Sequence, residues 1–302
     1  MKILITGGTN GMGKGVAKAL ASIDNQNFEI IILCRSKELG EATIKEIESL
    51  TSNKNLSLIL CDLAKLSDVK KAIDEIQTKH TYLDAIFINA GLGYTPKRVE
   101  TEDGLDSHFQ VNYLSQFMLI LNLLNLLENS SIGGRVIFNV TQMGKIYWDD
   151  IQMKNKWGFE KAIHQSMFAK RMFFVKLNKL YRNIKNSKIS FVGFEISKTV
   201  WSNQINIIPF YMKLIASIMK LFGKFITIDE CGQIMSPLFT ESQEESFKKS
   251  GKLITYKNNK FIEINENKDI FDTELQDKLW NISLSLCNDD KTTMITEKIM
   301  KK

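Results

Sequence analysis

The sequence predicts an α/β protein with a doubly wound parallel sheet, arranged in three α/β/α layers within a single domain. Two observations carry this prediction. Short, continuously apolar runs recur along the chain, as expected for strands that are covered on both faces. The stretches between these runs carry apolar residues at helical spacing, and such alternation implies right-handed crossovers in one parallel sheet.

The expected elements follow in order along the chain. We expect strands at residues 3–6, 28–34, 56–61, 85–89, 135–141 and 188–194. We expect the helices between and after them at residues 13–22, 37–50, 67–79, 104–127 and 160–183. The 302 residues contain no repeat, no low-complexity block and no linker, so one domain over residues 1–302 is the better interpretation.

The pattern changes after residue 199. Residues 205–228 are rich in Ile, Phe, Met and Leu, and Pro209 suits the first turn of a helix. Lysines interrupt this segment too often for a membrane span of about 20 apolar residues. They are Lys213, Lys220 and Lys224. We favour an insertion at about 200–228 that covers the substrate and packs on the core; the alternative is an amphipathic helix at a membrane surface.

Two further elements are expected near the end. Residues 252–256 and 261–264 flank Asn258 and Asn259 and predict a hairpin or an extension at the sheet edge. Residues 272–287 predict a closing helix.

Composition excludes several classes of protein. Hydrophobic residues make up 44% and charged residues 25%, which is typical of a soluble globular chain. Forty basic and 34 acidic residues give a net charge of +6 without long basic runs, which argues against nucleic-acid binding. The chain opens on a strand, so we expect no signal peptide or N-terminal anchor. We expect a cytoplasmic location, and residues 205–228 leave membrane association open.

Cysteines point to a reducing compartment rather than to a metal site. The four cysteines are isolated and no Cys/His cluster is present, so we expect reduced thiols and no bound metal. They are Cys34, Cys61, Cys231 and Cys287.

A glycine-rich turn links the first strand to the first helix. Residues 6–14 read TGGTNGMGK. A tight turn needs φ angles open to glycine, and a diphosphate needs close backbone approach and free N–H groups at a helix N-terminus. The context predicts a dinucleotide site of the Rossmann type. Its residues would be Gly7, Thr9, Asn10, Gly11, Met12 and Gly13.

The spacing TGxxxGxG resembles the short-chain dehydrogenase/reductase family, on its retinol-dehydrogenase-like side. Other marks occur in order: 61–63 read CDL, 89–91 read NAG and 109–114 read FQVNYL, and the resemblance covers roughly residues 1–256. It implies an Asp at the adenine and an Asn in the last of these segments, at Asn112. It adds to the cofactor site Asp62, Leu63, Asn89, Ala90 and Gly91.

Cofactor preference can be argued from charge. An acidic residue after the second strand would accept hydrogen bonds from the ribose of NAD(H). This chain has Arg35 and Ser36 there, and Lys14 lies in the glycine turn. Cations favour a 2′-phosphate, so the sequence predicts NADP(H) rather than NAD(H).

The resemblance also implies a catalytic Ser, a proton-donating Tyr and a Lys four residues after it. The Ser position falls on Gln142. Residues 162–169, AIHQSMFA, correspond to the family's A-Y-x-Q-S-K-x-A, with Ile163 for Tyr and Met167 for Lys. An alternative frame keeps Lys170 but then puts Ser166 in the Tyr position. Neither frame supplies a Tyr.

Two Tyr-x-x-x-Lys matches elsewhere are interpreted as coincidence. Tyr181 and Lys185 begin 18 residues after Ile163. At about 1.5 Å per residue, they lie roughly 27 Å farther along the helix. Tyr256 and Lys260 fall in the late hairpin.

Substitutes for the lost groups are available. His164 adjoins the Tyr position, Tyr147 and Tyr94 lie in loops that should border the pocket, and Glu195 follows the sixth strand. Each has an ordinary role as its alternative: a surface histidine, loop aromatics and a solvated carboxylate. The candidate catalytic residues are Asn112, Gln142, Tyr147 and His164.

The leading hypothesis is an NADP(H)-binding relative of this family that has lost the Ser/Tyr/Lys set and binds a small apolar substrate. Its rivals are an active NADPH-dependent oxidoreductase of a hydrophobic carbonyl or alcohol with substitute residues, a non-redox cyclase, isomerase or dehydratase, and a nucleotide-dependent interaction protein.

Family members commonly pair through helices that correspond to 104–127 and 160–183. Arg171 and Lys176 would oppose this pairing, so monomer or homodimer stays open.

Overall fold

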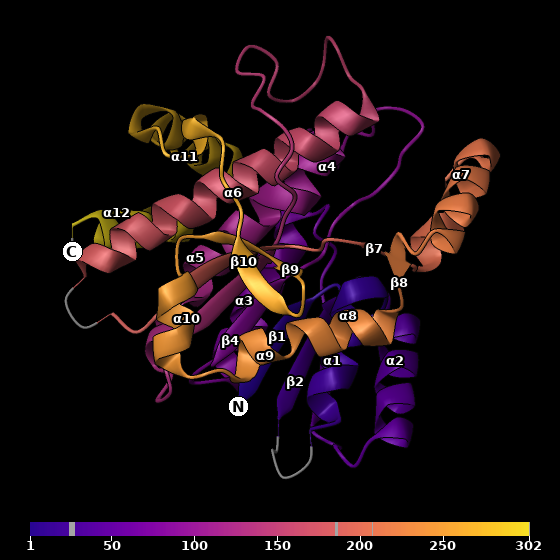
Figure 1. Ribbon diagram of the computed structural model, residues 1–302. Coiled ribbons are helices and arrows are strands. Elements are labelled where there is room, and N and C mark those ends of the chain that lie inside the picture. Colours follow the sequence, from indigo (N-terminus) through magenta and orange to yellow (C-terminus); the bar gives the residue numbers. More distant parts are fainter. Residues whose placement is uncertain (24–27, 185–186, 207, 302) are drawn as a thin grey trace.

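An eight-stranded sheet forms the centre of the computed structural model, which describes residues 1–23, 28–184, 187–206 and 208–301 (Figure 1). The strand order is β10-β9-β6-β5-β4-β1-β2-β3, and all neighbours are parallel except β9 and β10. The strands are β1 (Lys2–Thr6), β2 (Glu29–Cys34), β3 (Leu56–Leu60), β4 (Ala85–Ile88), β5 (Arg135–Asn139), β6 (Ser190–Glu195), β9 (Leu253–Lys257) and β10 (Lys260–Glu263).

The topology confirms the doubly wound, single-domain prediction. β1 pairs with β2 on one side and with β4 on the other, so the chain winds outward in both directions from this point. In doubly wound sheets, ligands bind at such a switch point, here the carboxyl ends of β1 and β4. The six strands expected from the sequence correspond to β1–β6, and their ends agree within two residues.

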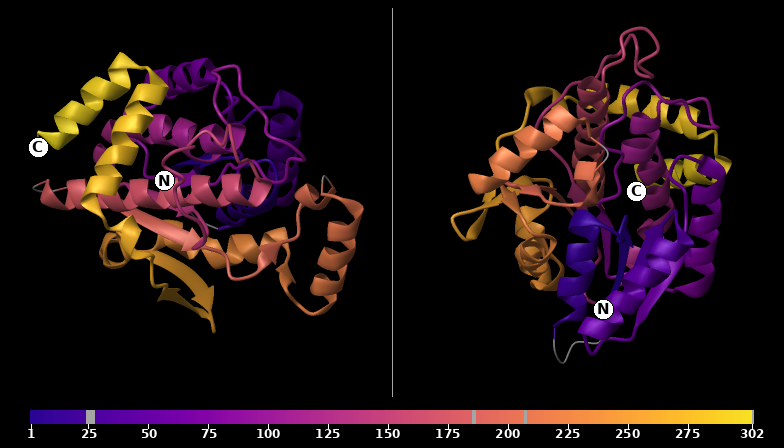
Figure 2. Two further views of the ribbon diagram at one scale, coloured as in Figure 1. Left: turned by 90° about the horizontal axis from the view of Figure 1, so that it is seen from above. Right: turned by 90° about the vertical axis from the view of Figure 1, so that its right-hand side faces the viewer.

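Helices cover both faces of the sheet and bury two apolar clusters (Figures 1 and 2). One face carries α1 (Gly11–Ala21), α2 (Lys37–Leu50), α8 (Ile228–Met235) and α9 (Pro237–Thr240). The other carries α3 (Leu66–Lys79), α5 (Ser115–Glu128), α6 (Phe159–Asn183), α11 (Thr273–Cys287) and α12 (Asp290–Met300). The short α10 (Gln243–Lys249) lies beside β6, where Ser246 Oγ and Ser190 Oγ are 2.6 Å apart.

The single helix expected at 104–127 is divided into three parts. Asp106 caps the start, because its Oδ1 accepts from Phe109 N (3.0 Å). After α4 (Ser107–Phe109) the backbone widens into a π-helix, η1 (Gln110–Leu114), and continues as α5. Gln116 Nε2 donates to carbonyl oxygens of η1, including that of Val111 (2.8 Å). The π segment contains Asn112, and such segments often occur at functional sites.

The segment after β6 forms an arm that stands away from the body (Figures 1 and 2). Two short parallel strands, β7 (Thr199–Val200) and β8 (Phe225–Ile226), form its neck. Between them lie η2 (Asn203–Asn206) and α7 (Phe210–Leu221), which Pro209 precedes. Residue 207, within the predicted insertion, lies outside the described residues. No helix within the described ranges is both long and apolar enough to cross a membrane.

The late hairpin is confirmed by β9 and β10. Asn258 and Asn259 have φ angles of 52° and 58°, which is the left-handed pair that a two-residue hairpin turn of type I′ requires. The closing helix is also confirmed: α11 follows Asp272, whose Oδ1 accepts from Leu275 N (3.0 Å). The helices α8, α9, α10 and α12 were not expected from the sequence.

Candidate functional site

The glycine turn lies at the carboxyl end of β1, beside the switch point of the sheet. Gly7 and Gly11 have φ angles of +69° and +53°, a region that side chains disfavour. A Cβ at Gly13 would overlap the carbonyl oxygen of Gly7 and lie 2.6 Å from Asn89 Nδ2. The helix that begins here is therefore held tightly against the turn.

The N-terminus of α1 is prepared for an anion. Asn10 is the N-cap residue, but its side chain accepts no capping hydrogen bond, and the first turn contains no acidic side chain. The free N–H groups and the helix dipole favour negative charge at this point. Thr9 and Met12 are half-buried beside them. A diphosphate is the group that this arrangement suits.

The turn after β4 is joined to the glycine turn. Thr6 Oγ1 accepts from the backbone nitrogens of Asn89 (2.9 Å) and Ala90 (3.0 Å). Asn89 Nδ2 donates to the carbonyl oxygens of Thr6 (3.1 Å) and Gly7 (3.3 Å). Gly91 follows and is exposed. These bonds bring the two turns predicted from the sequence into one cradle.

The residues that the sequence predicts around the adenosine part of the cofactor differ in whether their side chains are free to bind it. Asp62 Oδ1 accepts from Ala64 N (3.0 Å), and Leu63 is buried. Lys14 Nζ donates to Glu46 Oε2 (2.6 Å), so this ammonium already has an anionic partner. Ser36 caps α2, whereas Arg35 is exposed and has no ion pair among the described residues.

In the first of the two frames, the positions of the family's Tyr and Lys hold a hydrocarbon and a thioether. Ile163 and Met167 are half-buried on the first turns of α6. Ser166 is fully buried: its Oγ accepts from Asn112 Nδ2 (3.0 Å) and donates to Ile163 O (2.7 Å). Asn112 also clamps the loop after β4, because its Oδ1 accepts from Leu92 N (2.6 Å). Both side chains therefore serve packing of η1 against α6.

Lys170 points to the back of the cradle. Its Nζ donates to Asn139 O (3.2 Å), and Asn139 Nδ2 donates to Asn89 Oδ1 (3.3 Å). The side chain is fully buried, and this desolvation lowers its pKa to about 7. The alternative frame that keeps Lys170 thus leads to a real buried amine, one turn beyond Met167.

An ionic cluster that was not predicted from the sequence anchors the loop after β5. Arg171 is fully buried; its guanidinium donates to Thr141 O and its Nε lies 3.4 Å from Glu266 Oε2. Burial raises the pKa of Glu266, and Arg171 opposes this shift. The side chain of Gln142 donates to Asn265 O, next to Glu266. The backbone N of Gln142 donates to Glu195 Oε1 at the end of β6 (2.9 Å).

The remaining candidates lie around the loop after β5. Tyr147 N donates to Gln165 Oε1 (2.8 Å), and the ammoniums of Lys145 and Lys161 lie 5.1 and 5.9 Å from its ring centroid. His164 is half-buried, and its backbone passes close to Gly144. Tyr94 packs edge-on against Phe159 (5.1 Å between centroids). No three potential metal ligands gather in the part of the chain that the structure describes.

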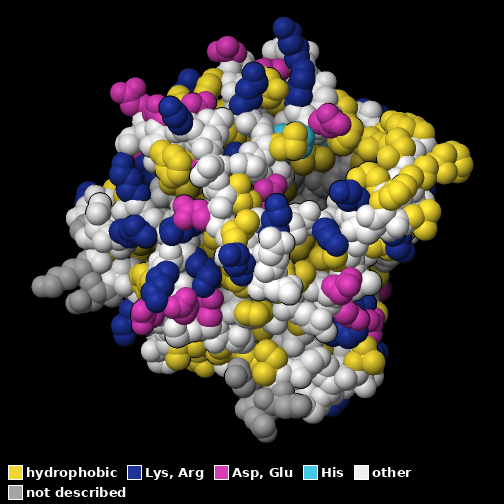
Figure 3. All heavy atoms as spheres, in the orientation of Figure 1, with side chains coloured by type: hydrophobic (Ala, Val, Ile, Leu, Met, Phe, Trp, Pro, Cys, Tyr) yellow, Lys and Arg dark blue, Asp and Glu magenta, His cyan; other side chains and the backbone are white. Residues whose placement is uncertain are grey.

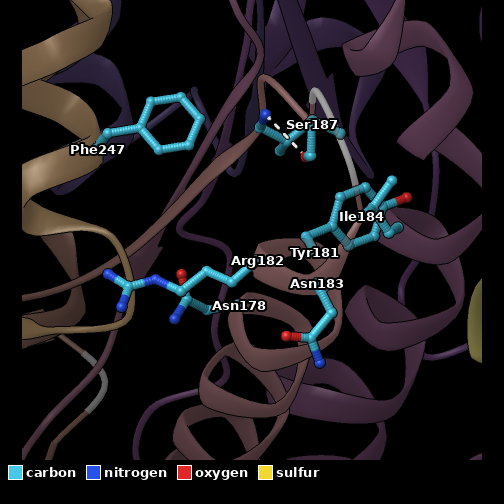
Figure 4. A pocket seen from close by; sticks show the side chains of 8 residues that line it. Asn178, Tyr181, Arg182, Asn183, Ile184, Ser187 and Phe247 are labelled. Carbon is cyan, nitrogen blue, oxygen red and sulfur yellow. Dashed lines mark hydrogen bonds between the residues drawn. The ribbon is translucent and has the colours of Figure 1, made fainter. Parts of the chain in front are cut away.

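A hollow of about 340 Å³ lies far from this cradle, at the amino end of β6 (Figure 4). Tyr181 and Ile184 line one side of it and Phe247 the other. Tyr181 donates to Glu128 Oε1 (3.2 Å), and burial raises the pKa of its phenol. Lys185, four residues later, lies outside the described residues.

Known proteins resemble this chain in sequence over half of its length or somewhat more. The family model described as short chain dehydrogenase matches residues 1–152. Polyprenol dehydrogenase of Homo sapiens is 29% identical over 183 residues, which are 59% of this chain and 54% of that protein. Retinol dehydrogenase 13 of Homo sapiens is 31% identical over 182 residues, 59% and 53% of the two chains. The chain thus spans about half the length of the curated relatives it matches.

Solved structures share the fold. The NADPH-bound carbonyl reductase from chicken fatty liver has a TM-score of 0.60 at 18% identity, covering 84% of this chain and 95% of that one. The L-sorbose reductase from Gluconobacter frateurii, solved with NADPH and L-sorbose, has a TM-score of 0.65 at 13% identity, covering 84% and 94%.

Proposed function

Because the chain belongs to the short-chain dehydrogenase family, we propose that it binds NADP(H) in the cradle at the carboxyl ends of β1 and β4 while lacking the family's Ser/Tyr/Lys set. The single observation that supports cofactor binding most strongly is the joined pair of turns. Asn89 Nδ2 bonds to Gly7 O, and the uncapped N-terminus of α1 opens beside it. When bound, the nicotinamide would accept or donate a hydride.

Cofactor preference is the first test of the proposal. Fluorescence titration should give tighter binding of NADPH than of NADH, because the exposed Arg35 is the cation placed to meet a 2′-phosphate. Arg35→Ala should remove this preference by weakening NADPH roughly tenfold, a loss of about 1.4 kcal/mol. Lys45→Ala, at an exposed position farther along α2, serves as the matched control. Equal affinities of the unaltered protein for both cofactors would contradict the NADP(H) assignment.

Chemistry at the family's usual positions is expected to be weak or absent. A hydrocarbon at Ile163 can neither give nor take a proton, and the thioether of Met167 carries no charge to favour a phenolate. Gln142 can donate and accept hydrogen bonds, but its side chain is bound to Asn265 O. We therefore propose that turnover of carbonyls, if measured, is far below that of an intact Ser/Tyr/Lys set.

A second test restores the lost set. Gln142→Ser, Ile163→Tyr and Met167→Lys combined should produce NADPH oxidation with hydrophobic aldehydes or ketones, by at least roughly a hundredfold over the parent, since general acid catalysis is worth at least this factor. The variant with only Gln142→Ser is the control. Brisk turnover by the unaltered protein would show that substitute residues already perform the reaction.

One observation favours that second candidate, an active oxidoreductase. The ammoniums of Lys145 and Lys161 lie 5.1 and 5.9 Å from the ring centroid of Tyr147, and Tyr and Lys are the residue types that the family uses. Loss of NADPH oxidation in Tyr147→Phe, with cofactor binding unchanged, would support it.

The substrate class is proposed as small and apolar. Polyprenol dehydrogenase and the retinol dehydrogenases among the relatives are named for such molecules. The role of residues 200–228 as a cover for the substrate stays a prediction. The large apolar side chains of α7 are exposed and do not close over the cradle as they stand. Contact with a membrane through residues 205–228 is part of the same proposal.

A further inference from the structure

The apolar face of α7 points away from the protein. Its side chains are exposed to an unusual degree for large hydrophobic residues, from 42% to 86%: Phe210, Tyr211, Leu214, Ile215, Ile218, Met219 and Leu221, continued by Phe222. Apolar side chains cover much of the surface at this corner of the molecule (Figure 3). A contiguous patch of this kind marks an interaction site.

The side of α7 with few large side chains faces the body of the protein. Ala216 is the buried residue of this helix, and Lys220 Nζ lies 4.0 Å above the ring of Trp201. At 100° per residue, the apolar side chains occupy an arc of roughly 200° opposite to this contact. A helix that covered a pocket would turn this arc inward. In this protein the apolar face of the helix instead points to the solvent, and the side with Ala216 and Lys220 faces the body.

A lipid surface fits this helix better than a protein groove. α7 is a convex ridge of 12 residues, about 18 Å long, too short to span a bilayer but suited to lie in its interface. Lys213, on the polar side of the helix, and Lys224, exposed just beyond its end, are cations near the apolar arc that Trp201 does not engage, and they would meet anionic headgroups.

We propose that α7 docks on an anionic bilayer with its apolar arc in the headgroup–acyl boundary, so that the cofactor cradle sits at the membrane surface. The proposal rests on the function proposed above, because the neck of the arm joins the two sites. β7 pairs with β8, and Ser202 Cβ lies 3.5 Å from the place where a Cβ of Gly11 would stand. An apolar substrate would reach the cradle from the lipid without crossing water.

Vesicle co-sedimentation tests the docking. The protein should bind vesicles of phosphatidylcholine with phosphatidylserine, and it should bind vesicles of phosphatidylcholine alone more weakly. Binding should decrease as the salt concentration rises. Leu214→Ser, Ile218→Ser and Leu221→Ser combined should lower partitioning at least roughly tenfold. Lys213→Gln with Lys224→Gln should remove the preference for phosphatidylserine. Leu39→Ser with Leu50→Ser, at similarly exposed positions of α2, is the matched control and should bind as the parent does.

The outcomes are separable from those of the cofactor proposal. The triple serine variant should keep the parent's melting temperature and NADPH affinity, because the altered side chains are exposed. Failure of the parent to bind either kind of vesicle would overturn the docking proposal and leave cofactor binding standing. Dimerisation of the parent in sedimentation analysis, abolished by the triple variant and without vesicle binding, would overturn it in favour of a second copy on α7.

Discussion

Replacing Lys170 by methionine should stabilise the protein most strongly below pH 7. The unfolded chain titrates this amine near 10.5, whereas burial lowers the pKa in the folded state to about 7. Below pH 7 both states carry the proton, so the full cost of burying an ammonium is present. Between pH 7 and 10.5 only the unfolded state binds it, and this cost declines as the pH rises.

The size of the effect follows from the shift. A difference of about 3.5 pKa units corresponds to on the order of 5 kcal/mol at most, at about 1.4 kcal/mol per unit. Urea unfolding of Lys170→Met and of the parent, at pH 6 and pH 9, measures it. The gain should be several kcal/mol at pH 6 and clearly smaller at pH 9. Lys161→Met, exposed on the same helix, is the control and should change stability little at either pH.

A loss of stability in Lys170→Met at pH 6 would contradict this account and would mean that the bond to Asn139 O outweighs desolvation. The affinity of Lys170→Met for NADPH provides a further measurement, because a chain of hydrogen bonds links Lys170 to Gly7 through Asn139 and Asn89. A buried charge kept at a net cost is typical of functional rather than structural positions.

Replacing Gly13 by alanine should abolish useful NADPH binding. The added methyl group would overlap the carbonyl oxygen of Gly7 and crowd Asn89 Nδ2, and both belong to the cradle. Backbone atoms fixed by the ends of β1 and β4 cannot withdraw without moving the turn, so we expect at least roughly a hundredfold weaker binding, about 2.7 kcal/mol. Fluorescence titration measures the affinity, and a thermal melt shows whether the fold survives.

Gly158→Ala is the matched control for this substitution. Gly158 has no positive φ, and the atoms nearest to the place where its added methyl group would stand, on Lys161, are 3.8 Å away or more. It should bind NADPH as the parent does. Undiminished NADPH affinity in Gly13→Ala would place the nucleotide elsewhere in the molecule and refute the proposed cradle.

Sequence reasoning located the sheet because buried parallel strands are continuously apolar, and this signal depends on local composition alone. It could not find the π segment at 110–114, since a widened turn leaves no mark in the spacing of apolar residues. For residues 205–228 it favoured packing on the core over contact with a membrane surface, whereas the large apolar side chains of α7 are exposed. Amphipathic spacing shows that two faces differ, but it does not say which one meets the protein.

At the site, the backbone was easier to predict than the use of side chains. Glycines at 7, 11 and 13 are needed for turn geometry, so their roles follow from the motif. Whether a polar side chain stays free depends on neighbours distant in sequence: Lys14 is taken by Glu46, and Asn112 by Leu92 and Ser166. The pairing of Arg171 with Glu266 has the same origin, because the chain returns over α6 only after β10.

The C-terminal helices have a consequence for assembly. α11 and α12 lie over α5 and α6, where Tyr113 Oη and Ser283 Oγ are 2.7 Å apart and Asn122 Nδ2 donates to Thr292 Oγ1 (2.8 Å). Lys176, on the outer side of α6, is paired with Asp277 of α11. The outer sides of α5 and α6 are thus occupied by the chain's own C-terminal helices, and a second copy could not pack directly on the area that these helices cover.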